Sequence, residues 1–391
     1  MAITGAHVAR APRIRLGMVG GGRDAFIGAV HRIAARLDDQ YELVAGCFSS
    51  NAEKSMASGA DLGVDPKRTY ADFSEMAARE ARRKDGIEAV AIVTPNHMHA
   101  PVALQFLKRG IHVICDKPLT ATLPEAKKLA KAAEASGVVF ALTHNYTGYP
   151  MIRQAAAMVK AGELGDIRLV QVEYAQDWLA EPIEQTGQKQ ADWRTDPARS
   201  GAGGATGDIG THAFNLAGFV TGLEVETLAA DLQSFVPGRR VDDNGHILMR
   251  YKGGARGMLW CSQVATGLEN NLRLRVYGTK SSIEWSQEDP NYLWVGPLGQ
   301  PRYRLTRGGA GTGAEAGRLT RIPAGHPEGY LEGFANIYAE AARAILARRD
   351  GTALDAAVTF PGLKEGIAGV AFVDACVRSS GRNGAWVSLN I

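Results

Sequence analysis

The first 145 residues alternate short apolar runs with helical stretches, and this alternation restricts the chain to few folds. The expected strands cover residues 14–19, 41–48, 89–94, 112–115 and 138–142, and the expected helices include residues 25–37 and 124–136. Strands and helices that alternate at these spacings are typical of a doubly wound parallel sheet. The sequence therefore predicts an N-terminal α/β domain of the Rossmann type.

The pattern changes after about residue 145. Longer strand candidates, separated by Gly-rich turns, cover residues 166–174, 227–235, 246–251, 255–263 and 271–278. Several alternate in character, which favours a large, mostly antiparallel sheet with one face on helices and the other open. The Gly- and Ala-rich stretch 308–317 predicts a mobile loop. The last two helices of the chain are expected at residues 331–348 and 362–378. We expect two domains, residues 1–145 and 146–391, in a chain of the α/β class.

The charge balance and the cysteine pattern exclude several classes of protein. With 44 Lys and Arg against 41 Asp and Glu, the net charge of +3 is too small to predict binding to nucleic acid or to a membrane surface. The lead before Ala11 lacks the apolar segment of a secretory signal, and no apolar run is long enough to span a membrane. The scattered cysteines, without metal-ligand spacing, predict reduced thiols, no metal centre and a cytoplasmic protein; they are Cys47, Cys115, Cys261 and Cys376.

A Gly-rich turn, Gly20-Gly21-Gly22, follows the first expected strand and precedes the first expected helix. Such a turn lets backbone N–H groups reach a pyrophosphate at the N-terminus of a helix. A tight G-x-G-x-x-G motif would place its third glycine at Ala25, so Gly28 fills that role only if about three residues are inserted. We expect Gly20, Gly22 and Ile27 to contact a dinucleotide here.

The end of the second expected strand, Cys47-Phe48-Ser49-Ser50-Asn51, lacks the acidic residue that usually binds the ribose hydroxyls of NAD. Ser49 and Ser50 can hydrogen-bond either a hydroxyl or a phosphate, and Lys54 follows closely in the sequence. These residues are predicted to bind the cofactor, and NAD and NADP both stay open. A plain strand-to-helix turn explains the same residues equally well.

The segment Gly207-Asp208-Ile209-Gly210-Thr211-His212 carries the clearest chemical signal. If it is helical, Asp208, His212 and Asn215 share one face, while the opposite face is apolar. Lys117, which follows a buried strand, can meet that pair across a cleft. Oxidation of a polyol needs a cation to hold the oxygen and a base to take its proton, and these residue types supply both.

Each of these three residues also has an ordinary structural explanation. His212 can be a hydrogen-bonded helix histidine, and Asp208 can be the N-cap of a helix. Lys117 can be a solvated lysine in a loop before proline. Their occurrence together in one chain favours the catalytic interpretation.

Three motifs in order, Thr94-Pro95-Asn96-His97-Met98-His99, Asp116-Lys117-Pro118 and residues 207–212, resemble the Gfo/Idh/MocA family of oxidoreductases over about residues 13–380. The resemblance implies a Rossmann domain followed by an α/β domain with a large open sheet. It also implies reversible hydride transfer between a nicotinamide cofactor and a carbon of a sugar, an inositol or a related polyol. The order of the motifs is specific for the family, but not for one of its members.

The resemblance also assigns roles to residues. Lys117 matches the lysine beside the nicotinamide and the reacting hydroxyl, His212 the proton acceptor, and Asp208 a carboxylate that helps to bind substrate. The loop Thr94, Pro95 and Asn96 is expected to pass the nicotinamide ribose, with His99 and Asp116 close to the cofactor. Two departures are Asp116, where the family usually has Glu, and Asn215, where many members have Asp.

Several further polar residues are candidates for binding the cofactor or the substrate. Trp193 and Arg194 resemble a segment that lines the pocket, Asn145 and Tyr146 follow the last Rossmann strand, and Asp177 follows the strand at 166–174. His326 lies in a segment that either returns to the pocket or caps a helix. For Asn145 and Tyr146, a hinge with ordinary hydrogen bonds is the alternative.

Three functions are compatible with these observations. The first is an NAD(P)-dependent dehydrogenase acting on a cyclic polyol, sugar or glycoside, assembled as a homodimer or homotetramer as the family resemblance implies. The second is a relative that uses the cofactor to process glycosides or to reduce keto-sugars. The third is a non-catalytic nucleotide or sugar sensor, which the presence of both Lys117 and His212 disfavours.

Overall fold

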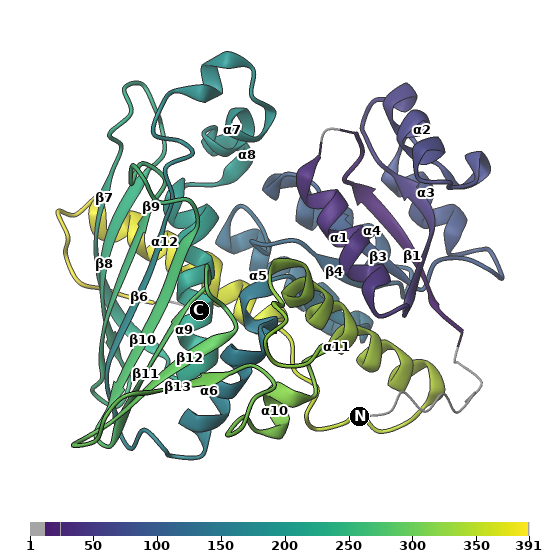
Figure 1. The fold of residues 1–391 in the computed structure, drawn as a ribbon. Helices are drawn as coiled ribbons and strands as arrows, with labels where there is room; N and C mark the ends of the chain where they lie inside the picture. Colours follow the sequence, from purple (N-terminus) through teal and green to yellow (C-terminus); the bar gives the residue numbers. More distant parts are fainter. Residues whose placement is uncertain (1–11, 24, 390) are drawn as a thin grey trace.

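The structure is a computed structural model, and it describes residues 12–23, 25–389 and 391. The first domain contains a five-stranded, all-parallel sheet in the order β2-β1-β3-β4-β5 (Figure 1). Its strands are β1 (Ile14–Gly20), β2 (Tyr41–Cys47), β3 (Ala89–Val93), β4 (His112–Cys115) and β5 (Phe140–Leu142). The doubly wound parallel sheet predicted from the sequence is confirmed.

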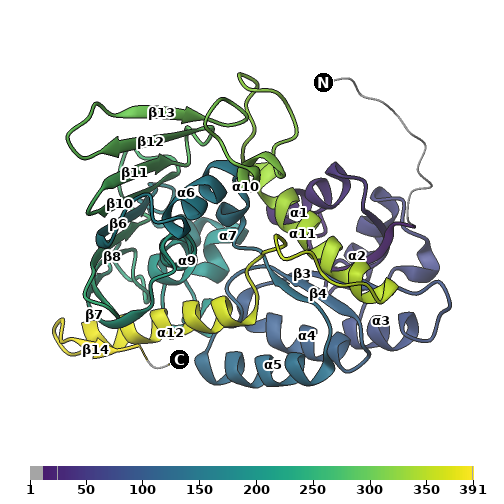
Figure 2. The same cartoon turned by 90° about the horizontal axis from the view of Figure 1, so that it is seen from below.

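Helices cover both faces of this sheet. They are α1 (Phe26–Leu37), α2 (Ala52–Asp61), α3 (Phe73–Glu80), α4 (His99–Leu107), α5 (Leu123–Ser136) and α11 (Tyr330–Asp350). Apolar residues of α3, α4 and α5 form one core with the strands, and those of α1 and α11 form another. Thus α11, from the C-terminal part of the chain, lies beside α1 and completes the cover of the Rossmann sheet (Figure 2).

The second domain is built on a nine-stranded sheet in the order β13-β12-β11-β10-β6-β9-β8-β7-β14. Its strands are β6 (Ile167–Ala175), β7 (Val225–Gln233), β8 (Asn244–Tyr251), β9 (Arg256–Ser262), β10 (Asn271–Gly278), β11 (Ser281–Ser286), β12 (Tyr292–Pro297), β13 (Tyr303–Thr306) and β14 (Val387–Ser388). The neighbours β6 and β9 are parallel and the other pairs are antiparallel, so the prediction of a mostly antiparallel sheet is confirmed.

One face of this sheet packs on helices, and the other is open. The packed face contacts α6 (Pro150–Lys160), α9 (Thr211–Thr221) and α12 (Leu363–Ser380) (Figure 1). Along β8, Ile247, Met249 and Tyr251 are buried while the residues between them are exposed, as expected for a sheet that is covered on one side. Short helices complete the domain: α7 (Lys189–Arg194), α8 (Pro197–Ser200) and α10 (Ala314–Gly317).

The prediction of a loop over residues 308–317 is wrong for its last four residues, which form α10. The backbone N–H of Gly313 donates to Gln154 Oε1 of α6, and Ala316 is buried, so contacts with α6 order a segment whose glycines alone predict a loop. All four cysteines are free and buried. No helix in the described part of the chain is long and apolar enough to cross a membrane. The lead before Ala11, where we expect no secretory signal, lies outside the described residues.

Candidate active site

The Gly-rich turn packs closely against the end of β3 and the start of α1 only because its glycines lack side chains. Gly20 and Gly21 have φ angles of +84° and +70°, which favour glycine. A Cβ on Gly28, in α1, would lie 2.3 Å from the Cα of Gly21. Gly28 therefore allows the close approach of α1 to the turn, which is the role of the third glycine in the G-x-G-x-x-G motif. It lies three residues beyond the position that the tight motif would give this glycine, as the sequence spacing predicts. The turn and the start of α1 fit the pyrophosphate of a dinucleotide.

The predicted ribose contacts have local structural partners. Ser49 Oγ accepts from the N–H of Asn51 at 3.1 Å, and Asn51 Oδ1 accepts from the N–H of Lys54 at 2.9 Å, which caps α2. Ser50 and the Lys54 side chain are exposed at this turn, and Ile27 packs against the core under α1. The alternative of a strand-to-helix turn therefore explains Ser49, while Ser50 and Lys54 are accessible to a ligand.

The side chains of His99 and Asn96 form hydrogen bonds between the segment after β3 and neighbouring parts of the chain. The two ring nitrogens of His99 lie 2.7 Å from the carbonyl oxygen of Pro118 and 2.9 Å from that of Thr94. The Asn96 side chain donates to the carbonyl of Ser200 in the second domain at 2.8 Å. Thr94 Oγ1 is buried without a partner among the described residues, so it is available to a cofactor that passes this loop and Pro95.

The carboxylate of Asp116 is held within the protein. Its Oδ1 accepts from the N–H of Lys117 at 2.9 Å and from Thr143 Oγ1 at 3.0 Å, and it lies 3.9 Å from His31 Nε2. Burial alone would raise the pKa of Asp116, but the interactions with His31 and Lys117 lower it well below its usual range. Asp116 is therefore an anion that orders the backbone at Lys117, despite being one methylene shorter than the usual glutamate.

Lys117 and Asp208 form the centre of the site, at the junction of the two domains. Lys117 Nζ donates to Asp208 Oδ1 at 2.7 Å and to the Asp208 carbonyl at 2.6 Å, and the two side chains are only 13% and 17% exposed. Asp208 Oδ2 accepts from Gln263 Nε2 at 2.9 Å and from Arg194 Nε at 3.2 Å. Although burial would raise the pKa of Asp208, Lys117 and Arg194 lower it well below the usual range. The alternatives of a solvated lysine and of a simple helix cap do not describe these contacts.

A turn of π-helix, Thr206–Gly210, precedes α9 and carries Asp208, so the helix predicted for this segment is present with a wider first turn. The opposite, apolar face is buried as predicted, through Ile209, Ala213, Leu216 and Val220. One turn later His212 is buried, with its ring 5.3 Å from that of His144 and 4.9 Å from that of Tyr146.

His212 has no partner for Nδ1 within the described chain, so it is not the hydrogen-bonded helix histidine of the alternative interpretation. Burial, together with the nearby positive charge of Lys117, lowers the pKa of His212 well below the ordinary value. The pKa of His144 is lowered to about 3, mainly by burial. Both rings are therefore neutral near pH 7, and His212 is in the state that accepts a proton.

Further polar side chains surround this centre. Both side-chain atoms of Asn145 are buried and lack partners in the part of the chain that the structure describes. The Tyr146 hydroxyl lies 2.5 Å from that of Tyr174, which donates to Asn270 Oδ1 at 2.7 Å. Buried polar groups without a hydrogen-bond partner, like the amide of Asn145, are rare in proteins unless a ligand or water satisfies them. The Asn215 Oδ1 is a similar buried acceptor without a partner in the described residues.

The sequence did not identify Gln263, Tyr174 or Asn270 as part of the site. Gln263 directly follows β9, Asn270 directly precedes β10, and Tyr174 is near the end of β6. Polar residues at the same end of three neighbouring strands were the available signal, but the strand order was needed to recognise it.

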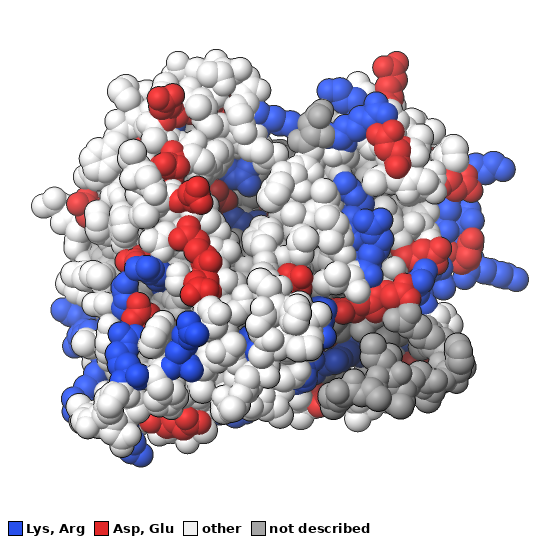
Figure 3. All heavy atoms as spheres, viewed as in Figure 1, with Lys and Arg blue, Asp and Glu red and all other residues white. Residues whose placement is uncertain are grey.

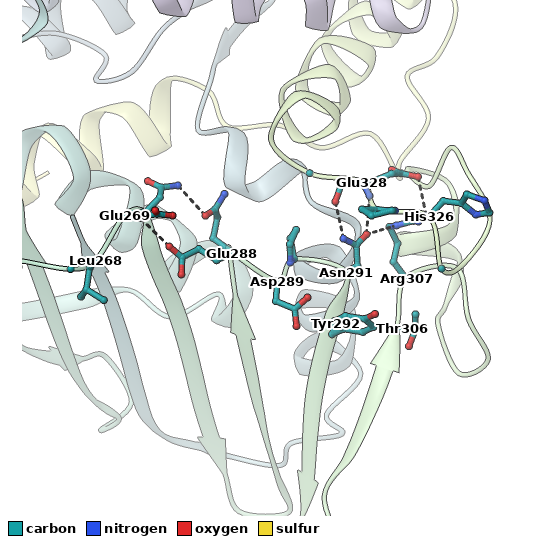
Figure 4. A pocket seen from close by; sticks show the side chains of 17 residues that line it. Leu268, Glu269, Glu288, Asp289, Asn291, Tyr292, Thr306, Arg307, His326 and Glu328 are labelled. Carbon is teal, nitrogen blue, oxygen red and sulfur yellow. Dashed lines mark hydrogen bonds and ion pairs between the residues drawn. The ribbon is translucent and has the colours of Figure 1, made fainter. Parts of the chain in front are cut away.

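The remaining predicted residues are placed as follows. The Arg194 guanidinium lies 4.3 Å from the Trp193 ring, which fixes the direction of its Nε–H toward Asp208. Asp177, which follows β6, accepts at Oδ2 from the N–H of Gly267 in the loop between β9 and β10, so its carboxylate contacts a neighbouring loop of the large sheet. His326 does not cap α11, whose N-cap is Gly329, but lines a cavity at the end of the large sheet (Figure 4). In Figure 3 the surface is hollowed between the two domains, with Lys or Arg atoms at the bottom of the hollow.

Comparison with known proteins agrees with this arrangement. The family described as oxidoreductase family, NAD-binding Rossmann fold, matches residues 14–157, and the GFO/IDH/MocA C-terminal domain matches residues 152–284. An uncharacterized oxidoreductase of Bacillus subtilis, YfiI, is 36% identical over 391 residues, which cover 99% of each chain.

Two solved structures are also similar along the whole chain. An oxidoreductase from Sinorhizobium meliloti is 62% identical, with a TM-score of 0.89 and coverage of 96% of this chain and 100% of that one. An inositol dehydrogenase homolog from Azotobacter vinelandii, complexed with NAD+, is 40% identical, with a TM-score of 0.93 and coverage of 97% and 98%. The resemblance noted in the sequence is confirmed: the chain belongs to the Gfo/Idh/MocA family of oxidoreductases, and its first domain is the NAD-binding Rossmann fold of that family.

Proposed function

We propose that this oxidoreductase acts on a hydroxyl-bearing carbon of a cyclic polyol, a sugar or a glycoside. The bound nicotinamide cofactor supplies the acceptor for the hydride that leaves this carbon. The observation that carries the proposal is the contact of Lys117 Nζ with Asp208, 2.7 Å away, beside the neutral and buried His212. A cation, an anion and a neutral base in one cleft are the groups that oxidation of an alcohol requires.

In this proposal, Lys117 holds the substrate oxygen. A lysine ammonium has three N–H donors, and two of them point to the carbonyl and the carboxylate of Asp208. The third can donate to the reacting hydroxyl and stabilise the negative charge that develops on its oxygen. Asp208 fixes the direction of this donor and keeps a buried cation compensated.

His212 accepts the proton of the reacting hydroxyl. Its lowered pKa keeps the ring neutral at physiological pH, so no prior deprotonation is needed. A weak base is sufficient here because the charge of Lys117 makes the bound hydroxyl more acidic. The unpartnered amide of Asn145 is suited to a second hydroxyl of the same substrate, since it offers both a donor and an acceptor.

The similar proteins support this substrate class. The Azotobacter homolog was also solved with NADH and myo-inositol, and a levoglucosan dehydrogenase from Pseudarthrobacter phenanthrenivorans is 27% identical over 306 residues. We propose NAD as the cofactor, and NADP is the alternative because Ser49 and Ser50 replace the acidic ribose ligand. Calorimetric titration of the purified chain with NAD and NADP in parallel decides between them.

The proposal is tested by following NADH production with myo-inositol, levoglucosan and D-xylose as substrates. We expect turnover with at least one, and a loss of at least about 100-fold in Lys117→Ala, with NAD affinity measured separately as a control. The matched control is Lys252→Ala, a lysine in an exposed ion pair with Glu224. Full activity of Lys117→Ala would contradict the proposed role.

We also propose that the chain forms a homodimer or homotetramer through the open face of the large sheet. On strands of this sheet Leu169, Leu248 and Met258 are 48%, 53% and 45% exposed, a contiguous apolar surface of the kind that proteins usually cover. Light scattering of the wild type should give a mass at least twice that of one chain, and Leu248→Glu should lower it. A monomer at micromolar concentration would refute this proposal.

A further inference from the structure

The turn of π-helix that carries Asp208 is held at its start by one residue from another part of the second domain. This residue, Asp242, lies between β7 and β8 and accepts the backbone N–H groups of three consecutive residues. Its Oδ1 accepts from Gly204 at 2.7 Å, its carbonyl oxygen from Ala205 at 2.8 Å, and its Oδ2 from Thr206 at 2.7 Å. These N–H groups belong to the first turn of the helix, which leaves them without partners inside the helix.

The hydroxyl of Thr206 makes this contact specific for a carboxylate. Thr206 Oγ1 donates to the same Oδ2 of Asp242 at 2.7 Å, so the two carboxylate oxygens accept three hydrogen bonds. Thr206 is fully buried, and Asp242 is 8% exposed. An asparagine at this position would direct its own N–H2 group at one of these donors, whereas a carboxylate only accepts. The position therefore requires an aspartate.

The buried carboxylate of Asp242 has no cation to compensate it. Within the described residues no Lys or Arg is bonded to its side chain, and burial raises its pKa although the donors of Thr206 and Gly204 oppose this. Burial of a carboxylate without a cation costs free energy. A neutral Ser or Asn would cap a helix as well as an Asp does. A residue that is costly for the fold in this way is typical of a functional site.

The next residue, Asp243, connects the same loop to Gln263. The carbonyl oxygen of Asp243 accepts from the backbone N–H of Gln263 at 2.8 Å, and Gln263 Nε2 donates to Asp208 Oδ2 at 2.9 Å. The Asp243 carboxylate accepts from the backbone N–H groups of Phe235 and Val236, which fixes the loop between β7 and β8. This loop therefore holds both the turn that carries Asp208 and the amide that binds its carboxylate.

The place where the turn begins decides how Lys117 is held. Lys117 Nζ donates to two acceptors of one residue, Asp208 Oδ1 at 2.7 Å and the Asp208 carbonyl at 2.6 Å. A backbone carbonyl cannot follow a lysine unless its helix moves. The N–H of Asp208 donates to the carbonyl of Gly204 at 2.8 Å, which connects Asp208 directly to the segment that Asp242 holds. Such wide helical turns occur frequently at functional sites.

We propose that Asp242 is a positioning residue for the reaction. Through Thr206 it fixes the π-helical turn, so that the carboxylate and the carbonyl of Asp208 both face Lys117 Nζ. Lys117 thereby keeps its third N–H for the substrate oxygen. Asp242 acts through the turn and not by contact with the reacting atoms. The proposal rests on the proposed function for the role of Lys117.

The test removes the hydroxyl of Thr206, because Asp242→Asn would also disturb the backbone contacts of the turn. Thr206→Val keeps the shape of the side chain and loses the O–H donor, whereas Thr206→Ser keeps the donor. We measure kcat with myo-inositol, levoglucosan or D-xylose, whichever the wild type oxidises. It should fall at least about 10-fold in Thr206→Val and stay within about 3-fold of the wild type in Thr206→Ser. NAD affinity, measured by calorimetric titration, should not change, since the Rossmann domain binds NAD.

The matched control is Thr221→Val, which removes a buried hydroxyl from the other end of α9. Thr221 Oγ1 donates to the carbonyl of Ala217 at 2.7 Å, and its loss should leave kcat unchanged. A structural role alone predicts that Thr206→Val lowers the unfolding temperature but not kcat. Full kcat in Thr206→Val, or an equal loss in Thr206→Ser, would overturn the proposal.

A double-mutant cycle separates this proposal from the proposed function. If Thr206→Val already weakens the contact of Asp208 with Lys117, Asp208→Asn should lower the unfolding temperature less in that background than in the wild type. Additive effects of the two changes on the unfolding temperature would overturn the positioning role. Absence of NADH production with every polyol, together with a non-additive cycle, would instead refute the proposed function and leave the control of the turn by Asp242 standing.

Discussion

Replacing Asp208 by Asn should destabilise the protein and inactivate it for one electrostatic reason. The carboxylate accepts charge-assisted hydrogen bonds from Lys117 and Arg194 and a neutral one from Gln263, in a site where it is 17% exposed. Each charge-assisted bond contributes about 1.5–3 kcal/mol. Breaking a buried ion pair from one side costs about 3–5 kcal/mol, because the remaining cations lose their compensation. We therefore expect Asp208→Asn to lower the free energy of unfolding by about 3 kcal/mol.

Thermal unfolding followed by circular dichroism measures this loss, which corresponds to about 6–12 °C for a domain of this size. The activity should fall by about 100-fold, because Lys117 loses the contact that directs its free N–H. The matched control is Asp192→Asn, whose carboxylate is 55% exposed in an ion pair with Arg199 and should contribute less than about 1 kcal/mol.

The way in which the stability contributed by Asp208 changes with pH can be checked independently. Because the pKa of Asp208 is lower in the folded protein, its contribution to stability is complete above the unfolded value of about 3.9 and is lost as the pH falls through the folded pKa. The difference between the wild type and Asp208→Asn should therefore be constant near neutrality and shrink only in acid. Equal unfolding temperatures at pH 7, or a difference that grows in acid, would refute the reasoning.

Three further changes test other parts of the site. His212→Asn should lower kcat by about 10²–10⁴-fold. The rate of substrate oxidation by the wild type should stay constant with pH around neutrality. It should decrease only well below about pH 6.5, because the pKa of His212 is lowered and the ring must be neutral to accept a proton. Gly28→Ala places a Cβ 2.3 Å from the Cα of Gly21 and should weaken NAD binding by at least about 10-fold in a calorimetric titration, whereas Gly218→Ala, where a Cβ meets nothing within 4 Å, should not. Asn145→Ala should raise the KM for the polyol while leaving the unfolding temperature equal or higher, since it removes a buried amide without partners; a lower unfolding temperature would contradict its assignment to the substrate.

Much of the fold could be predicted because each signal was local. The strand at His112–Cys115 and the strand at Asn271–Gly278 were predicted with the bounds that the structure has, since apolar runs bounded by turn residues determine them. The position of α11 against α1 could not be predicted, because nothing in a helical pattern identifies which distant sheet it covers. The short helix α10 was missed because it depends on contacts with α6 rather than on propensity.

The candidate site shows the same division. Lys117, Asp208 and His212 are predicted from residue type, spacing and the family motifs, and the structure brings Lys117 and Asp208 into direct contact. Gln263 and Asn270 were missed because their role depends on which strands are neighbours in the second sheet. Their polarity at a strand end is too common a feature to identify a site.

The two domains supply charged groups that compensate one another at this centre. Lys117 comes from the loop after β4 of the Rossmann domain, whereas Asp208 and Arg194 come from the second domain. Separated from Lys117, Asp208 would keep only Arg194 as a charged partner, and Lys117 would lose both of its acceptors. A second hydrogen bond between the domains joins Asn96, in the segment after β3, to the carbonyl of Ser200 at the end of α8. In the proposed mechanism, the cation that stabilises the substrate oxygen is directed by a carboxylate from the other domain. A change in the relative position of the domains would therefore change the direction of that hydrogen bond and, with it, the rate.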